Sequence, residues 1–301
     1  MRDREYALAK EKNKKRIVVL GDSFTSGFGV PDNATFTKVM ETILENHTEV
    51  LNFGVNGYGP TQELLTLQTK AIKYSPDLVI MVIYIGNDFY DILGISDWID
   101  GYVRPKAVID NQGKLRITNI PIPLPKNNPA TEKTKNACKL PASHFSEFID
   151  KYIHRNKYAI NSMPPEIAFC KRKKDPDIQK ASRLMEAVVS ETNTYCRQHR
   201  ASFMIAIAPT IVQVYDQMYW GKIINDYHLK IDEYDLYLPN RILIDIFSRI
   251  GIPAIDLTEA LKSSIDKGND TYYFYNQHWN KAGEQVVAET IARFIKDKKL
   301  L

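Results

Sequence analysis

Short apolar segments alternate with amphipathic stretches along the chain, and this alternation limits the fold more than any other feature. The segment RIVVLG at 16–21 is apolar almost throughout and ends at glycine, which is typical of a strand buried on both faces. Strands of this kind separated by helices indicate a parallel α/β sheet. We predict strands at 16–21, 49–54, 77–85, 202–208 and 252–256, and helices near 34–46, 61–74, 176–199, 239–250 and 280–297.

The chain is long enough for one large domain. Its 301 residues, 44% of them hydrophobic, can bury a full core. Residues 89–175 interrupt the alternation with a β-hairpin pattern about a glycine turn and a proline-rich stretch at 121–129. This region has too few apolar residues for a core of its own. We therefore predict a single domain over 1–301, with 89–175 as an insertion over the carboxyl edge of the sheet.

Charge and cysteine content exclude several kinds of partner. The 40 basic and 36 acidic residues are mixed along the chain and leave a net charge of +4, so nucleic acid is not an expected partner. The three cysteines are too widely spaced for a metal site. No stretch approaches the ~20 apolar residues of a membrane span, and the first sixteen residues are too charged for a signal peptide.

The loops after the predicted strands contain the residue types that acyl transfer needs. Ser23 follows the first strand and is the candidate nucleophile, and His278 in the late segment YNQHWNKAG is the candidate base. The backbone N–H groups of Ser23 and Gly57 and the side-chain amide of Asn87 are the candidate oxyanion donors. Because ligands bind at the carboxyl ends of strands in open α/β sheets, these loops are expected to form one site. Asp22 and Asp88 adjoin Ser23 and Asn87 and are assigned supporting roles.

Each of these segments also has a purely structural interpretation. Asp22 and Ser23 could cap the next helix, Asn87 could lie in a plain turn, and His278 could be a packed histidine ahead of a helix capped by Asn280. A dinucleotide site at Gly54, Gly57 and Gly59 is discounted, because the glycine spacing is reversed from the fingerprint.

The ordered motifs resemble a known family. Gly-Asp-Ser near the N-terminus, a glycine after the second strand, Gly86-Asn87-Asp88 after the third and a late histidine before the last helix are similar to the SGNH, or GDSL-type, hydrolases. The resemblance covers nearly the whole chain, with 89–175 as the variable part. It implies a flavodoxin-like sheet and ester hydrolysis through a serine, with neither metal nor organic cofactor.

One position departs from the family pattern. Members usually carry an aspartate two or three residues before the histidine, where this chain has Asn276 and Tyr275. The side-chain carbonyl of Asn276 could hold the imidazole, but it would give the imidazolium no charge partner. Asp256 or Asp270 could replace it from another loop, and a Ser–His dyad is the remaining alternative.

We therefore expect a serine esterase that hydrolyses or transfers an O-acyl group on a small molecule or a surface glycan. The lead-in at 2–23 is similar to the segment that follows an N-terminal anchor helix in membrane-anchored bacterial members, so an anchor before residue 1 and an extracytoplasmic location are also expected. The alternative is a carbohydrate-binding module of the same fold with impaired catalysis.

Overall fold

The centre of the protein is a sheet of five parallel strands. A computed structural model gives this structure and describes residues 4–45, 47–94, 103–122, 165–172 and 175–301. The strand order is β2-β1-β3-β6-β7, so β1 lies between β2 and β3. The predicted α/β fold with a five-stranded parallel sheet is confirmed. The strands are β1 (Lys15–Gly21), β2 (Thr48–Gly54), β3 (Leu78–Tyr84), β6 (Ser202–Ala208) and β7 (Ala254–Asp256).

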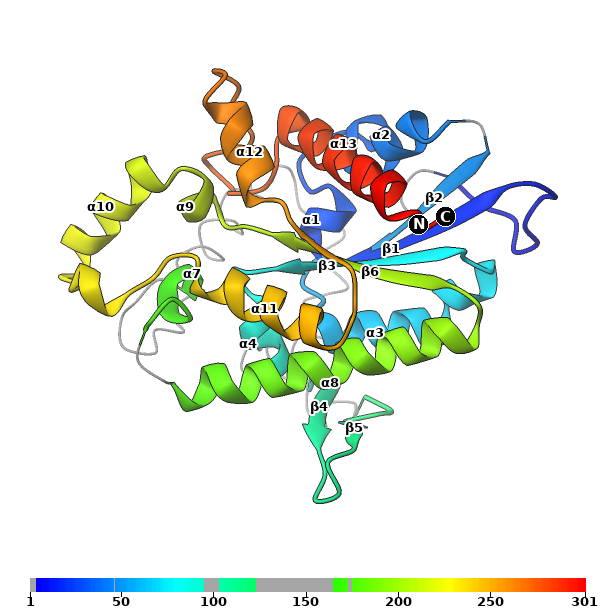
Figure 1. Cartoon of the computed structure of the whole chain (residues 1–301), viewed down its shortest axis with the longest axis horizontal. Helices are drawn as coiled ribbons and strands as arrows, with labels where there is room; N and C mark the ends of the chain where they lie inside the picture. The colour runs from blue at the N-terminus through cyan, green and yellow to red at the C-terminus, as the bar shows by residue number, and fades with distance from the viewer. Residues whose placement is uncertain (1–3, 46, 95–102, 123–164, 173–174) are drawn as a thin grey trace, which may run out of the picture.

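Helices cover both faces of the sheet (Figure 1). On one face lie α2 (Phe36–Ile43), α12 (Thr258–Ile265) and α13 (Lys281–Lys298). On the other lie α3 (Pro60–Thr69), α8 (Pro176–Gln198) and α11 (Leu238–Arg249). The five predicted helices are therefore present, although the one expected at 61–74 ends as the 3₁₀ helix η2 (Ala71–Tyr74), and α12 was not predicted.

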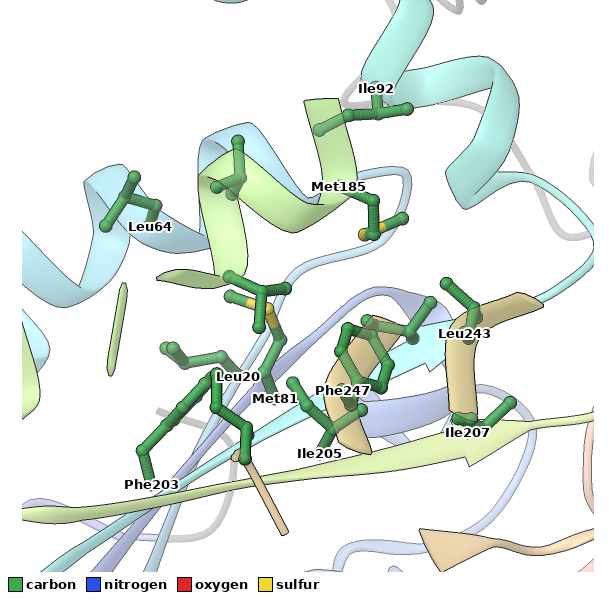
Figure 2. Packing of buried hydrophobic residues seen from close by; sticks show 14 of the residues in the cluster. Leu20, Leu64, Met81, Ile92, Met185, Phe203, Ile205, Ile207, Leu243 and Phe247 are labelled. Carbon is green, nitrogen blue, oxygen red and sulfur yellow. The ribbon is translucent and has the colours of Figure 1, made fainter. Parts of the chain in front are cut away.

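The strands alternate their side chains between the two helical layers. In β1, Ile17 and Val19 pack toward α2 and α13, whereas Val18 and Leu20 pack toward α3 and α8. All four side chains are completely buried. Figure 2 shows the second layer, in which strand residues such as Leu20 lie beneath helix residues such as Met185. Burial on both faces explains why the strands have nearly continuous apolar sequences.

Short helices follow three strands at the carboxyl edge of the sheet. The first helices after β1, β3 and β6 are α1, α4 and α9, and α10, which follows α9, has no buried residue. The remaining described helices are α1 (Ser23–Ser26), α4 (Asp88–Leu93), α7 (Pro165–Ala168), α9 (Ile211–Val214), α10 (Asp216–Asp226), η1 (Asp32–Ala34) and η3 (Ile231–Glu233). Within the described ranges, none of the helices has the length and apolar character that a membrane crossing requires.

The predicted hairpin is present as β4 (Lys106–Ile109) paired antiparallel with β5 (Leu115–Thr118). It packs against α4 and α8. Figure 1 shows it on the side of α8 that faces away from the sheet. The placement of the 89–175 insertion as a whole stays a prediction, because residues 95–102, 123–164 and 173–174 lie outside the described part of the chain.

Candidate active site

Ser23 is the first residue of α1, immediately after the central strand β1. The carboxylate of Asp22 caps this short helix, because its Oδ1 accepts a hydrogen bond of 2.9 Å from the Phe24 N–H. Gly21 makes the sharp exit from the strand, where a Cβ would collide with the Thr25 hydroxyl. The sequence GDS therefore turns the chain so that the serine lies at the carboxyl edge of the sheet.

His278 is positioned by a compact loop ahead of α13. The loop is closed by two hydrogen bonds of 2.8 Å, one from the Tyr273 N–H to the His278 carbonyl and one from the Gln277 N–H to the Tyr273 carbonyl. At its end, the Asn280 side chain caps α13 by accepting from the N–H groups of Ala282 and Gly283. The cap predicted at Asn280 is thus confirmed, and it fixes the point at which the histidine loop joins the helix.

The structure brings Ser23 and His278 into direct contact. His278 Nε2 lies 2.8 Å from Ser23 Oγ, and Nδ1 lies 2.8 Å from the backbone carbonyl oxygen of Asn276. Because a carbonyl oxygen can only accept, Nδ1 carries the imidazole hydrogen and Nε2 is left to accept from the serine hydroxyl. The imidazole therefore has the tautomer that a general base requires.

Aromatic rings enclose the imidazole. The Phe24 ring is stacked on it at 4.8 Å between centroids, and the Phe28 ring lies at 4.9 Å. Burial lowers the pKa of His278 to about 4, although the hydrogen bond to the Asn276 carbonyl acts in the opposite direction. The imidazole is therefore neutral at pH 7, and its protonation is disfavoured.

The contact between His278 and Asn276 differs from the one considered on sequence grounds. The Asn276 side chain does not reach the imidazole, because its Oδ1 accepts from the His278 backbone N–H at 3.0 Å. Asp256 accepts from Asn240 and Thr258, and Asp270 accepts from the Tyr215 hydroxyl. Among the described residues, His278 Nδ1 thus donates its hydrogen bond to the main-chain carbonyl of Asn276 rather than to a carboxylate.

The two other candidate oxyanion loops flank Ser23, because β2 and β3 are the neighbours of β1. Gly57 lies in the loop after β2 with a φ of +74°, a left-handed conformation that favours glycine, and the turn is closed by a 2.9 Å bond from Tyr58 N–H to the Val55 carbonyl. Asn87 follows β3 and its carbonyl begins α4 by accepting from Tyr90 and Asp91. The oxyanion roles of these donors stay predictions.

A cavity of about 500 Å³ opens between α1 and the loop after β2. Phe28, whose ring contacts the His278 ring, forms part of its wall. Its lining combines aromatic rings with amide, hydroxyl and ammonium groups. Residues that contribute to it include Ser26, Phe28, Val55, Asn56, Tyr58 and Lys70.

A protein-family model matches the C-terminal part of the chain. Residues 171–301 match the family described as SGNH hydrolase-like domain, acetyltransferase AlgX. This part of the chain is therefore similar to an SGNH hydrolase-like domain. The matched residues include Asn276 and His278, whereas Ser23, Gly57 and Asn87 precede them. The resemblance to SGNH hydrolases inferred from the motif order is confirmed.

Several solved structures align with nearly the whole chain at low identity. LAE5, an alpha/beta hydrolase enzyme from the metagenome of Lake Arreo, aligns with a TM-score of 0.50 at 13% identity over 94% of this chain and 95% of its own. A catalytic mutant of Axe2, an acetylxylan esterase from Geobacillus stearothermophilus, aligns with a TM-score of 0.49 at 12% identity, over 95% of this chain and 96% of its own. A member of the lipolytic protein G-D-S-L family from Veillonella parvula aligns with a TM-score of 0.45 at 12% identity, over 93% of this chain and 97% of its own. No curated protein sequence matches significantly.

Two buried acids near the candidate active site were missed on sequence grounds. Glu63 in the first turn of α3 and Asp91 in α4 lie with the expected supporting residues Asp22 and Asp88, and all four carboxyl groups are at least nine-tenths buried. An acidic residue in the first turn of a helix ordinarily complements the helix dipole at the surface. For that reason no sequence pattern indicated that these two acids face the interior.

Proposed function

We propose that this chain is a serine esterase or O-acyltransferase that acts through an acyl-enzyme on Ser23. The observation that carries the proposal is the 2.8 Å contact between Ser23 Oγ and His278 Nε2, with the imidazole hydrogen held on Nδ1 by a carbonyl. A serine beside a correctly oriented base is the arrangement required for nucleophilic catalysis. The SGNH hydrolase-like fold supports chemistry at ester bonds.

In the proposed reaction, Nε2 takes the hydroxyl proton as Ser23 Oγ attacks the ester carbonyl carbon. The oxygen that becomes negative is stabilised by hydrogen-bond donors, for which the N–H groups of Ser23 and Gly57 and the Asn87 amide are the candidates. When the carbon–oxygen ester bond breaks, the imidazolium returns its proton to the departing alkoxide. Water or a sugar hydroxyl then attacks the acyl-enzyme with the imidazole again as base, so that hydrolysis and transfer share their first half.

The environment of His278 sets the strength of this base. The Asn276 backbone carbonyl holds the tautomer, as a triad carboxylate would, but contributes no full negative charge to stabilise the imidazolium. Burial disfavours the imidazolium further and lowers the pKa of His278 to about 4. A low basicity weakens general-base catalysis at neutral pH. We therefore expect modest turnover of small esters.

The Asn87 amide is suited to a donor role by its second hydrogen. Its side chain lies close enough to the Asp22 carboxyl to lower the pKa of that group against the larger effect of burial. An amide nitrogen carries two hydrogens, so one can anchor the side chain to Asp22 while the other is directed to the substrate. Anchoring of this kind fixes a donor before the reaction begins, which is the condition for oxyanion stabilisation.

A glycan ester is the substrate class that the surroundings favour. Aromatic rings such as Phe28 and Tyr58 can stack on sugar C–H groups, and Asn56 and Lys70 can hydrogen-bond to hydroxyl or acyl oxygens in the adjoining cavity. The matching family is described as an acetyltransferase, which supports an acetyl group as the one moved. The proposed site therefore removes or transfers acetyl groups on a carbohydrate.

A carbohydrate-binding module with impaired catalysis is the second candidate, favoured by the main-chain partner of His278. Turnover of p-nitrophenyl acetate separates the two candidates. The esterase proposal predicts release of p-nitrophenol above the buffer rate and its loss in Ser23→Ala, whereas Ser190→Ala, an α8 substitution outside the proposed site, keeps the wild-type rate. Acetylated-glycan binding without turnover by wild type would support the module instead.

A further inference from the structure

Four carboxyl groups meet behind the proposed oxyanion site. Asp22 lies between β1 and α1, Glu63 lies in the first turn of α3, and Asp88 and Asp91 lie in α4. Their residues are between 0% and 6% exposed, and mutual electrostatic effects connect all four. In the described chain, one cation pairs with this cluster, since Arg104 Nη1 lies 2.9 Å from Asp91 Oδ1.

Donors within the described chain satisfy only part of the acid cluster. Asp22 Oδ1 accepts from the Phe24 N–H and Asp88 Oδ2 accepts from the Tyr84 N–H at 2.8 Å. Asp22 Oδ2, Asp88 Oδ1 and both Glu63 oxygens are buried and receive no hydrogen bond from the described residues. A buried carboxylate that accepts no hydrogen bond is strongly disfavoured, and neighbouring negative charges add to the penalty. The arrangement is therefore incompatible with four ionised acids.

We propose that Glu63 and Asp88 are positioning residues, held as neutral carboxylic acids whose O–H groups donate to neighbouring carboxyl or amide oxygens of the cluster. Each neutral acid takes one proton from solvent on folding and supplies the donor that the unpartnered oxygens need. Two carboxyl groups that share a proton form a strong hydrogen bond in an enclosed site. The two remaining carboxylates are then stabilised by the Arg104 guanidinium at Asp91 and by the Phe24 N–H at Asp22.

This inference rests on the proposed function for its catalytic consequence. Each loop assigned an oxyanion donor supplies one acid to the cluster: Asp22 precedes Ser23, Asp88 follows Asn87, and Glu63 stands in the helix that begins after the Gly57 loop. The start of α3 packs closely against α4, because Gly59 leaves no room for a Cβ beside Asp91. Hydrogen bonds among the acids would therefore fix the three donors relative to one another.

The titration of the cluster agrees with its geometry. Burial and the neighbouring charges of Asp22 and Asp91 raise the pKa of Glu63 well above its usual value, and burial with the charge of Glu63 does the same for Asp88. Burial raises the pKa of Asp22 to about 7. The charged groups that face Glu63 are Asp22 from the end of β1, Asp88 and Asp91 from α4, and Arg104 through Asp91.

The test uses Glu63→Gln and Asp88→Asn, because an amide has the shape and hydrogen-bond donor of a neutral acid. In the unfolded chain both acids ionise above about pH 4, so a fold that keeps them protonated loses stability as the pH rises. The melting temperature of wild type should therefore fall between about pH 5 and about pH 9 more than that of either variant. Glu191→Gln, an exposed change in α8, should follow wild type across this range.

The infrared spectrum gives a second readout that is independent of turnover. Wild type at neutral pH should show the carbonyl stretching band of a protonated carboxyl group, and each amide variant should lose part of it. An unchanged band, parallel melting curves, or failure of both amide variants to fold at neutral pH would overturn the proposal. The infrared and melting measurements therefore test this proposal independently of whether the chain hydrolyses an ester.

The positioning role predicts a rescue pattern in serine labelling by a fluorophosphonate. Glu63→Ala should lower the labelling rate at least about tenfold at neutral pH, and Glu63→Gln should restore most of that rate. At about pH 9 the Gln variant should retain a larger share of its neutral-pH rate than wild type, because it has no proton to lose. Equal rates for the Ala and Gln variants would show that the proton donor has no role in positioning.

Discussion

Ser23 Oγ and His278 Nε2 lie 2.8 Å apart although 255 positions separate the two residues in the sequence. The contact forms because β1 delivers Ser23 to the carboxyl edge of the sheet and the capped start of α13 fixes the histidine loop against it. The end of a strand and the start of a helix therefore anchor the two segments that set the distance between the proposed nucleophile and its base.

The low pKa of His278 predicts an unusual pH profile. An imidazolium cannot accept the Ser23 proton, so activity is present above the pKa of His278 and is lost as the pH falls through it. The acidic limb of kcat/KM for an uncharged ester should have its midpoint near pH 4, as the pKa of about 4 requires. A midpoint near the ordinary histidine pKa would show that the Phe24 and Phe28 rings do not exclude water from the imidazole.

Asn276→Asp should move that acidic limb upward. The new carboxylate would keep the hydrogen bond from the His278 backbone N–H and place a negative charge close to the imidazole, which favours its protonated form. We expect a shift of up to about one pH unit and an increase in kcat of less than about tenfold, since the side chain is directed away from Nδ1. Asn276→Ala is the control without charge, and an equal shift there would exclude an electrostatic cause.

Asn87→Ala should lower kcat about 10²- to 10³-fold with little change in KM, as expected for loss of a donor that acts in the transition state. The control is Asn56→Ala, which removes an amide from the cavity wall and from its hydrogen bond with Ser26. That change should raise KM more than it lowers kcat. A rise in KM alone for Asn87→Ala would make Asn87 a residue of ground-state binding.

Gly57→Ala tests whether the conformation of this loop matters to catalysis. A Cβ at Gly57 would have room, since its nearest neighbour would be Arg104 Nη2 at 3.8 Å, but a φ of +74° disfavours any residue with a Cβ. We expect a loss of about 1 to 2 kcal/mol in unfolding free energy and a fall in kcat of about tenfold or more as the N–H moves. Gly251→Ala, with a φ of +69° and open space around it, should show the stability loss alone.

Much of the fold was predictable because the five strands are buried on both faces, which gives them nearly continuous apolar sequences. The helices α10 and α12 were not predicted. α10 contacts the core only through the partly buried Tyr219, Trp220 and Ile223, too few residues to form a clear apolar period. α12 spans only Thr258–Ile265, too few turns for the period to be read.

Part of the candidate site was likewise predictable from the sequence, and part was not. Strand ends brought Ser23, Gly57 and Asn87 to one edge, which the order of motifs predicted. The use of the Asn276 backbone carbonyl could not be predicted, because a sequence specifies side chains and every residue has a carbonyl. Glu63 was missed because its burial depends on how α3 packs against α4, a tertiary contact with no local sequence pattern.

Labelling with a fluorophosphonate, followed by peptide mapping, tests the central claim most directly, because the probe forms a covalent bond only with a serine activated as a nucleophile. We predict a single adduct on the peptide that contains Ser23, lost in Ser23→Ala and strongly slowed in His278→Ala. An adduct on another serine, such as Ser26 three residues further along α1, or a wild-type protein that remains unlabelled, would contradict the account.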